Sequence, residues 1–415
     1  MRDKTFSVLK ALAIILVVVS HSGAPAWLNR FIFQFHVPVF FICAGYFFGL
    51  HYLDDGRQFV RRRFTGLYVP FVKWSLILLV LHNLFFAIGL LNEQYGNASG
   101  GVLHPYNWHD FFQNIWNITT GMQGYDVFIG GAFWFFRALL VASLVFWLGL
   151  KFFRWLRPTD TLVQSAALLA VTMGLLIVWK IAAGLKIPAL AGGGYRELLG
   201  VMLMSFGLIY RQCRSYIPLN WKTGLAATTL TVLGAIYVHA SMASNADFGA
   251  FFGLLVPAMS GFMMLHYVSS LISAHLKPVE TALAYVGERT LYIFAWHLLA
   301  FKLVSIIKVA AYGLPWLAVG GHTVVNHATD DLFWLLYTIA GIGVPLGCLA
   351  LYRYYAKTID FSTKSCVKYA IKGLIKLCYY IFIGIKKSLI YLWQCLVGFW
   401  RALKDIVKAS SPNEE

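Results

Sequence analysis

Apolar runs of about twenty residues recur along this chain and limit it to few folds. Of its 415 residues, 59% are hydrophobic and 12% are charged, about half the charged fraction of soluble domains. Inside a bilayer an α-helix satisfies its own backbone polar groups. The sequence therefore predicts an all-α, polytopic membrane bundle with about ten transmembrane helices. These cover residues 6–24, 31–50, 67–91, 131–150, 161–183, 196–210, 223–241, 249–272, 290–309 and 332–353.

The first run has an alternative interpretation as a signal peptide. Arg2 and Lys4 precede it, and small residues follow it up to Ala26. However, Lys10 interrupts the run and a second run follows at once, which favours a membrane span.

The charges of the connecting segments predict an orientation. Connection 51–66 holds four arginines, whereas the long connection 92–130 holds carboxylates but no lysine or arginine. By the positive-inside rule, we expect 51–66 and both termini in the cytoplasm, in a multi-pass protein of the cell inner (plasma) membrane. Connections 92–130 and 310–331 then face outward. Lys186 and Arg196 fall on the outer side, against the rule.

The C-terminal segment differs from the rest of the chain. Nine basic residues between positions 364 and 408 fall within an arc of about 140° on a helix. This predicts a basic amphipathic helix that contacts anionic lipid at the inner leaflet. We therefore divide the chain into a membrane domain, 1–356, and a cytoplasmic tail, 357–415. An eleventh span near 377–400 is the alternative, although two lysines would lie in its middle.

Charge and cysteine content exclude several classes. The net charge of +17 comes from 34 basic and 17 acidic residues. In a membrane protein, orientation and anionic lipid account for such an excess, so we expect no nucleic-acid partner. The six cysteines show no CxxC spacing, and none lies in an expected outer connection. We therefore expect neither a disulfide framework nor a bound metal.

Lys10 and His21 are the first candidate functional residues. They stand eleven residues apart in one run, so on a helix they share a face and lie roughly 16 Å apart. Ionisable groups in a bilayer are costly and mark a functional site by default. A neutral histidine can take a proton from a hydroxyl as a general base. The alternative is a histidine that only hydrogen-bonds between packed helices.

Other ionisable residues interrupt later spans with few carboxylates beside them. Cations without carboxylate partners indicate an anionic ligand that enters the bundle. The alternative, for the lysines, is snorkelling from the ends of spans. Glu197 would pair with Arg196 or bind sugar hydroxyls. The residues concerned are His36, Lys73, Arg137, Lys180, His239, His266, His297 and Lys302.

Several motifs follow one another in a recognisable order. Residues 9–22 hold Lys10 and His21, and residues 35–48 hold His36 and an Ala-Gly pair. A basic stretch, 61–70, and motifs at 131–140 and 287–297 complete the series. This order resembles the acyltransferase family 3 membrane proteins over about residues 5–355. The predicted tail lies outside the resemblance.

The resemblance implies a fold and an activity. Such proteins have ten or so spans and transfer an acyl group, often acetyl from acetyl-CoA, to a hydroxyl of a surface glycan or a lipid-linked sugar. Acyl-CoA would be a co-substrate, and no permanently bound cofactor is expected. The family commonly has arginine where this chain has Lys10, and lysine lacks the bidentate fork that grips phosphate. It often has serine where this chain has Ala44.

For such a reaction we expect the following roles. His21 would take the proton of the acceptor hydroxyl, which then attacks the thioester directly; a covalent acyl-histidine is the alternative. Lys10 would line the donor path. The phosphates of CoA would meet three consecutive arginines, Arg61, Arg62 and Arg63; the alternative is that these arginines only set the orientation of the chain. The acceptor or the oxyanion would be held by His36, Arg137, Glu197 and His297.

A transporter or flippase of an anionic lipid-linked sugar is the rival function. It predicts matched Gly- or Pro-broken spans in two halves of the chain, and the sequence shows no such matching. A non-catalytic scaffold would tolerate the loss of His21. Small residues spaced over 341–347 favour helix packing within or between chains, so an oligomer is compatible with the sequence.

Overall fold

The computed structural model describes residues 4–96, 104–126, 128–187 and 191–358. Within these residues the chain is helical and contains no strand, so the prediction of an all-α fold is confirmed. The predicted tail lies, from residue 359 onward, outside the described residues, and so does the proposed eleventh span.

Among the described residues, eight helical runs are long and apolar enough to cross a membrane. They correspond to eight of the expected spans, so the protein is a multi-pass membrane protein. The runs are Lys4–His21, Ala26–Tyr46, Gly56–Ala87, Gly131–Leu156, Leu162–Ala182, Phe248–His275, Thr290–Tyr312 and Phe333–Tyr354.

The two other expected spans also form helices. Compared with the eight runs, one of these helices is less apolar and the other is shorter. They are α10 (Tyr195–Cys213), which carries charges near both ends, and α11 (Trp221–Tyr237), which has 17 residues. The exact count of ten therefore stays a prediction. The other helices are α1 (Lys4–His21), α2 (Ala26–Phe33), α3 (Pro38–Tyr46), α4 (Gly56–Arg63), α5 (Val69–Ala87), α6 (Glu93–Gly96), α7 (Trp108–Gly121), α8 (Trp134–Leu156), α9 (Leu162–Ala182), α12 (Phe248–His275), α13 (Lys277–Gly287), α14 (Thr290–Tyr312) and α15 (Phe333–Thr358).

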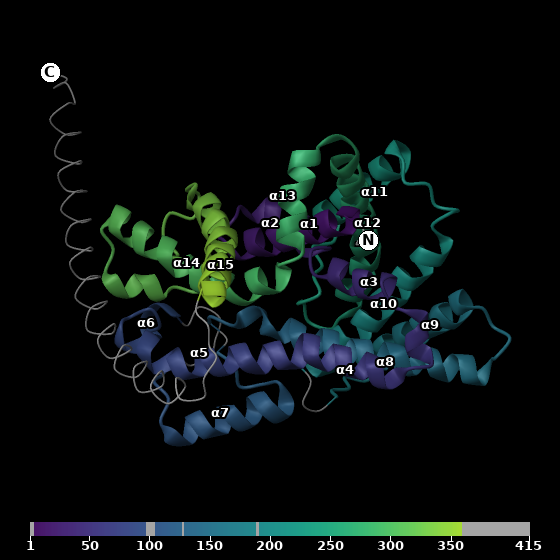
Figure 1. Ribbon diagram of the computed structural model, residues 1–415, viewed down its shortest axis with the longest axis horizontal. Coiled ribbons are helices and arrows are strands. Elements are labelled where there is room, and N and C mark those ends of the chain that lie inside the picture. Colours follow the sequence, from purple (N-terminus) through teal and green to yellow (C-terminus); the bar gives the residue numbers. More distant parts are fainter. Residues whose placement is uncertain (1–3, 97–103, 127, 188–190, 359–415) are drawn as a thin grey trace.

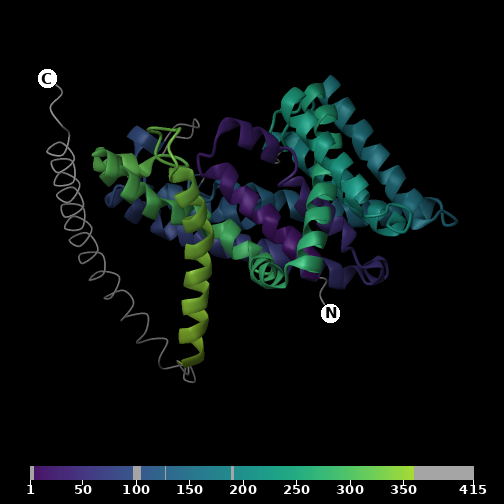
Figure 2. The same cartoon turned by 90° about the horizontal axis from the view of Figure 1, so that it is seen from above.

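Helix α1 lies in the middle of the molecule (Figure 1). It contacts α2, α3, α12, α13, α14 and α15. Helices α9 to α12 gather on one side of it, whereas α14 and α15 lie on the other (Figure 1). Helix α15 projects from the rest of the molecule (Figure 2). The central helix is thus the one that carries Lys10 and His21.

The second span is broken in its middle, between α2 and α3. Pro38 begins α3, and proline cannot donate the hydrogen bond that would continue α2. The side chain of Gln34 compensates by donating to the carbonyls of Arg30 at 3.1 Å and Phe31 at 3.3 Å. A broken helix is tolerated in a membrane where such groups are satisfied inside the protein. The break turns His36 into the interior.

Helices α3 and α10 cross at backbone contact. A Cβ atom added at Gly45 would lie 1.9 Å from the carbonyl oxygen of Met204. One added at Gly207 would lie 2.0 Å from the carbonyl oxygen of Ile42. Small residues allow membrane helices to approach this closely. The crossing fixes α3, and hence the break that positions His36.

Candidate functional site

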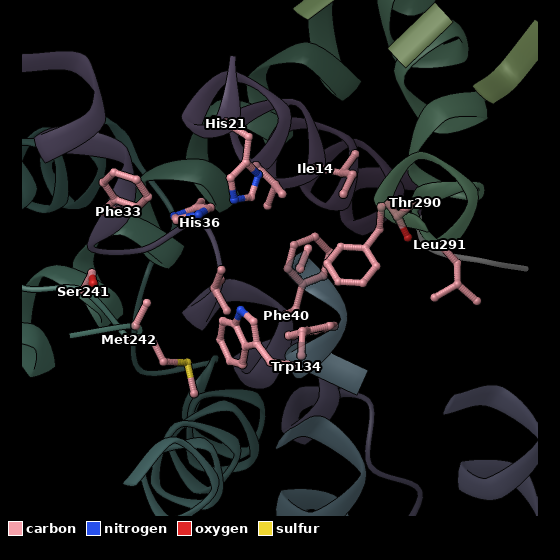
Figure 3. A pocket seen from close by; sticks show the side chains of 16 residues that line it. Ile14, His21, Phe33, His36, Phe40, Trp134, Ser241, Met242, Thr290 and Leu291 are labelled. Carbon is pink, nitrogen blue, oxygen red and sulfur yellow. The ribbon is translucent and has the colours of Figure 1, made fainter. Parts of the chain in front are cut away.

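A narrow pocket of about 120 Å³ lies beside His21 and is mostly apolar; we call it the His21 pocket (Figure 3). Its walls come from α1, the α2–α3 break, the start of α8, the connection before α12 and the start of α14. The lining residues are Ile14, Val17, His21, Phe33, His36, Val37, Phe40, Ala132, Trp134, Phe135, Ser241, Met242, Ala243, Thr290, Leu291 and Phe294.

One face of α1 forms a wall of this pocket. Ile14, Val17 and His21 all line it, and their spacing puts them on one helical face over about 10 Å. Lys10 continues the same face one turn earlier and lies close enough to Cys43 of α3 to interact with it electrostatically. Lys10 and His21 therefore share a face, as the sequence predicts, with the pocket between them.

A second histidine fixes the proton positions on His21. His297 is fully buried in α14, and its Nδ1 lies 2.9 Å from the carbonyl oxygen of Phe294. Carbonyls only accept hydrogen bonds, so Nδ1 carries the hydrogen and Nε2 of His297 is left as an acceptor. That Nε2 lies 3.2 Å from Nδ1 of His21. His21, which also donates to the backbone carbonyl of Val17, therefore carries its hydrogen on Nδ1. Its ring is turned into the pocket (Figure 3), which leaves Nε2 as the acceptor there.

The same reasoning applies to His36. Its Nδ1 lies 2.8 Å from the carbonyl oxygen of Ile32, so this nitrogen donates and Nε2 is an acceptor. Ser20 Oγ lies 3.5 Å from that Nε2 but directs its own hydrogen to the carbonyl of Val17 at 2.8 Å. The two histidines approach the pocket from the same side (Figure 3). Both offer lone pairs that accept hydrogen bonds from a bound hydroxyl.

Trp134 stands on the opposite wall and supplies a donor. The nitrogen edge of its indole ring is turned toward the side that holds the two histidines (Figure 3). The indole N–H can only donate. Sequence reasoning missed Trp134, because it lies within the motif 131–140 and carries no charge that would single it out.

Arg137 and Glu197 come together elsewhere. Both are buried, and they interact electrostatically with each other and with Arg196. Tyr125 adjoins the same group. The described lining of the His21 pocket includes none of these four residues. Arg196 stacks on Trp134 of that pocket, so this group adjoins the His21 pocket without lining it.

The three consecutive arginines at the end of α4 diverge. Arg62 donates to the hydroxyl of Tyr52 at 2.8 Å, Arg63 lies 5.2 Å from the ring of Phe59, and Arg61 is exposed. These arginines point to separate partners.

Two further arginines, which the sequence analysis did not single out, meet at the end of α3. Arg211 donates to the carbonyl of Tyr46 at 3.0 Å, and Arg214 donates to the hydroxyl of the same tyrosine at 2.9 Å. The ring of Tyr46 lies 4.3 Å from that of Phe6, near the start of α1. Arg211 and Arg214 therefore lie near the end of α1 that carries Lys10. A search of the sequence for clusters of arginines would not reveal this proximity.

The lysines for which snorkelling was the alternative behave differently from one another. Lys73 is exposed. Lys180 and Lys302 are buried, and they donate to loop carbonyls: Lys180 to Leu185 at 2.7 Å, and Lys302 to Gly321 at 2.8 Å. Over the described residues, no group of three or more His, Cys, Asp and Glu side chains is arranged to hold a metal ion.

A comparison with protein families shows to which family the chain belongs. The family model described as an acyltransferase domain matches residues 3–353, which reach from α1 into α15. The chain belongs to acyltransferase family 3. The resemblance predicted from the motifs is confirmed, and the protein is a membrane acyltransferase. No curated protein and no solved structure matched the chain.

Proposed function

We propose that this acyltransferase moves an acyl group, acetyl from acetyl-CoA, to a hydroxyl of a surface glycan or a lipid-linked sugar, with His21 as the general base. The observation that carries the proposal is the contact of 3.2 Å between His297 Nε2 and His21 Nδ1. It leaves a basic nitrogen on the wall of a pocket inside an acyltransferase fold. A base must reach the hydroxyl proton with a free lone pair.

The His21 pocket suits the thioester arm of the donor. It is narrow and apolar, and it follows α1 from Ile14 to His21. Cationic side chains lie beyond the Ile14 side, where the phosphates of CoA would bind. These are Lys10, as the sequence predicts, together with Arg211 and Arg214 beside Tyr46. Arg61 and Arg62 are exposed and would act at the entrance.

The proposed reaction is a direct transfer. The acceptor hydroxyl gives its proton to His21 Nε2 while its oxygen attacks the thioester carbonyl carbon. The carbon–sulfur bond then breaks, and the thiolate of CoA takes the proton back from His21. His297 stabilises the imidazolium by accepting its Nδ1 hydrogen, and the N–H of Trp134 donates to the developing oxyanion. His36 accepts a hydrogen bond from another hydroxyl of the sugar.

Acyl labelling of membranes tests this proposal. Membranes with wild type, His21→Ala or His275→Ala are incubated with acetyl-labelled acetyl-CoA, and label is followed into glycan and lipid fractions. His275 is an exposed histidine at the end of α12 and serves as the matched control. Label should appear with wild type and His275→Ala and be lost with His21→Ala. Equal labelling by His21→Ala would overturn the role of His21. Absence of label with acetyl-, succinyl- and longer acyl-CoA donors would contradict the proposal that acyl-CoA is the donor.

A further inference from the structure

A second cavity, of about 510 Å³, adjoins the acyl-transfer site; we call it the basic pocket. It lies where the connections after α9 and before α12 meet the start of α10. Its described lining contains three cationic side chains and no carboxylate. The lining residues are Lys180, Ile181, Gly184, Leu185, Lys186, Gly193, Tyr195, Arg196, Ala243, Ser244, Asn245 and Ala246.

These cations lie on the predicted outer side, where the positive-inside rule predicts few basic residues. Lys186 and Arg196 are the two residues that break the positive-inside pattern, and Lys180 now joins them in one cavity. Lys180 is only 7% exposed and donates to the carbonyl of Leu185 at 2.7 Å. Two carboxylates act on this group from outside the lining. Glu197 interacts with Arg196, and Asp247 interacts electrostatically with Tyr195 while it accepts from the N–H of Ala250 at 2.8 Å.

Tyr195 provides an independent indication of a ligand. It lines the basic pocket and is 1% exposed. Among the described residues, its buried hydroxyl has no hydrogen-bond partner. Buried hydroxyls in native proteins nearly always have one, because leaving them unpaired is costly. A ligand with acceptor oxygens in the pocket would satisfy this donor.

The basic pocket and the His21 pocket share a wall. Ala243 lines both, and Ser241 and Met242 continue the same segment into the His21 pocket. The guanidinium of Arg196 lies 4.3 Å from the ring centre of Trp134, which also lines the His21 pocket. The two cavities are therefore neighbours, and a molecule that reached both would hold an anionic group among the cations and a hydroxyl near His21.

We propose that the basic pocket binds a phosphate group of the acceptor, so that the acceptor is a phosphorylated or phospholipid-linked sugar. Arg196 and the two lysines donate charge-assisted hydrogen bonds to the phosphate oxygens, and the Tyr195 hydroxyl adds a neutral one. This inference rests on the proposed function for the acceptor, but the phosphate site itself does not depend on acyl transfer.

Phosphate binding by the whole protein tests the site. Protein purified in neutral detergent is titrated with inorganic phosphate by isothermal titration calorimetry. Wild type should bind phosphate, Lys186→Ala and Arg196→Gln should each weaken binding about tenfold, and the double variant should weaken it further. Tyr195→Phe should weaken it less. Lys222→Ala, which removes an exposed lysine at the start of α11, is the matched control and should bind as wild type does.

Two outcomes would overturn the site: no phosphate binding by wild type, or equal binding by wild type and the double variant. His21→Ala should bind phosphate as wild type does, so a failure of the acyl-labelling experiment leaves this readout intact. Repeating the titration in nanodiscs with and without phosphatidylglycerol identifies the source of the phosphate. Competition by the lipid assigns the site to a membrane-embedded headgroup, and unchanged binding assigns it to a soluble phosphate ester.

Discussion

The hydrogen-bond chain from the α14 backbone through His297 to His21 sets the chemistry at the residue scale. Each ring donates from Nδ1 and, in His297, accepts at Nε2. The chain resembles a base held in one tautomer by a second group, an arrangement that fixes which nitrogen takes the proton. His297 is thus a positioning residue, since it acts through His21.

Substitution of His297 should separate positioning from packing. In His297→Gln, the side-chain oxygen can still accept the His21 hydrogen, whereas in His297→Leu the new side chain cannot and the carbonyl of Val17 is the acceptor that remains. We expect the rate of acyl transfer to fall about a hundredfold in the leucine variant and about tenfold in the glutamine variant. In the pH–rate profile, the acid limb should be displaced from its wild-type position only in the leucine variant. Equal loss in both variants, with unchanged pH profiles, would contradict the positioning role.

Trp134 gives a second prediction at this scale. Trp134→Phe keeps an aromatic wall in the pocket but removes the N–H donor. If that donor stabilises the oxyanion, kcat should fall between about tenfold and a hundredfold while KM for acetyl-CoA stays near that of wild type. Steady-state kinetics on purified protein would measure this. A change confined to KM would instead show that the ring only shapes the pocket.

Single residues were predictable where helical periodicity governs them. Lys10 and His21 share a face because eleven residues complete three turns of one helix. The contact of His297 with His21 joins residues 276 positions apart, and it depends on how α14 packs against α1. No periodicity encodes that packing. Arg137 illustrates the same limit, since it lies in a recognised motif yet joins Glu197 outside the pocket.

At the scale of elements, the contact between α3 and α10 holds one wall of the site. Gly207→Ala should be strongly destabilising because its Cβ would overlap the carbonyl of Ile42 at 2.0 Å. Overpacking of this kind costs about 1–3 kcal/mol or more, which should lower the melting temperature of the purified protein by several degrees. Gly343→Ala on α15 is the control, since a Cβ there meets no atom within 4 Å. Equal melting temperatures would show that α10 can shift without cost.

The break in the second span shows what the sequence does and does not predict about elements. The run 31–50 was expected as one helix, yet α2 and α3 are separate and Pro38 begins the second. Proline in an apolar run permits either a kink or a break. Which of the two occurs depends on partners such as Gln34, whose amide satisfies the carbonyls left free.

At the scale of the whole molecule, charges held inside the bundle can hide a helix from a search by hydropathy. Helix α10 is largely enclosed by α3, α8 and α9, so it tolerates Arg196, Glu197 and Arg211 that a lipid-facing helix would exclude. Hydropathy therefore understates it. Helix α15, in contrast, is the least buried of the candidate spans at 22%, and hydropathy identifies it readily.

The orientation of the molecule can be tested with two matched substitutions. Asp54 and Asp330 are both exposed, one in the connection 51–66 and the other in 310–331. The arginines near Asp54 favour the cytoplasmic side, because moving them outward opposes the positive-inside bias. In a cysteine-free background, Asp330→Cys should react with a membrane-impermeant maleimide in intact cells, and Asp54→Cys should react only after permeabilisation. The reverse pattern would place His21 and the basic pocket on the opposite side, so that acyl-CoA and the acceptor would have to exchange their proposed routes of entry.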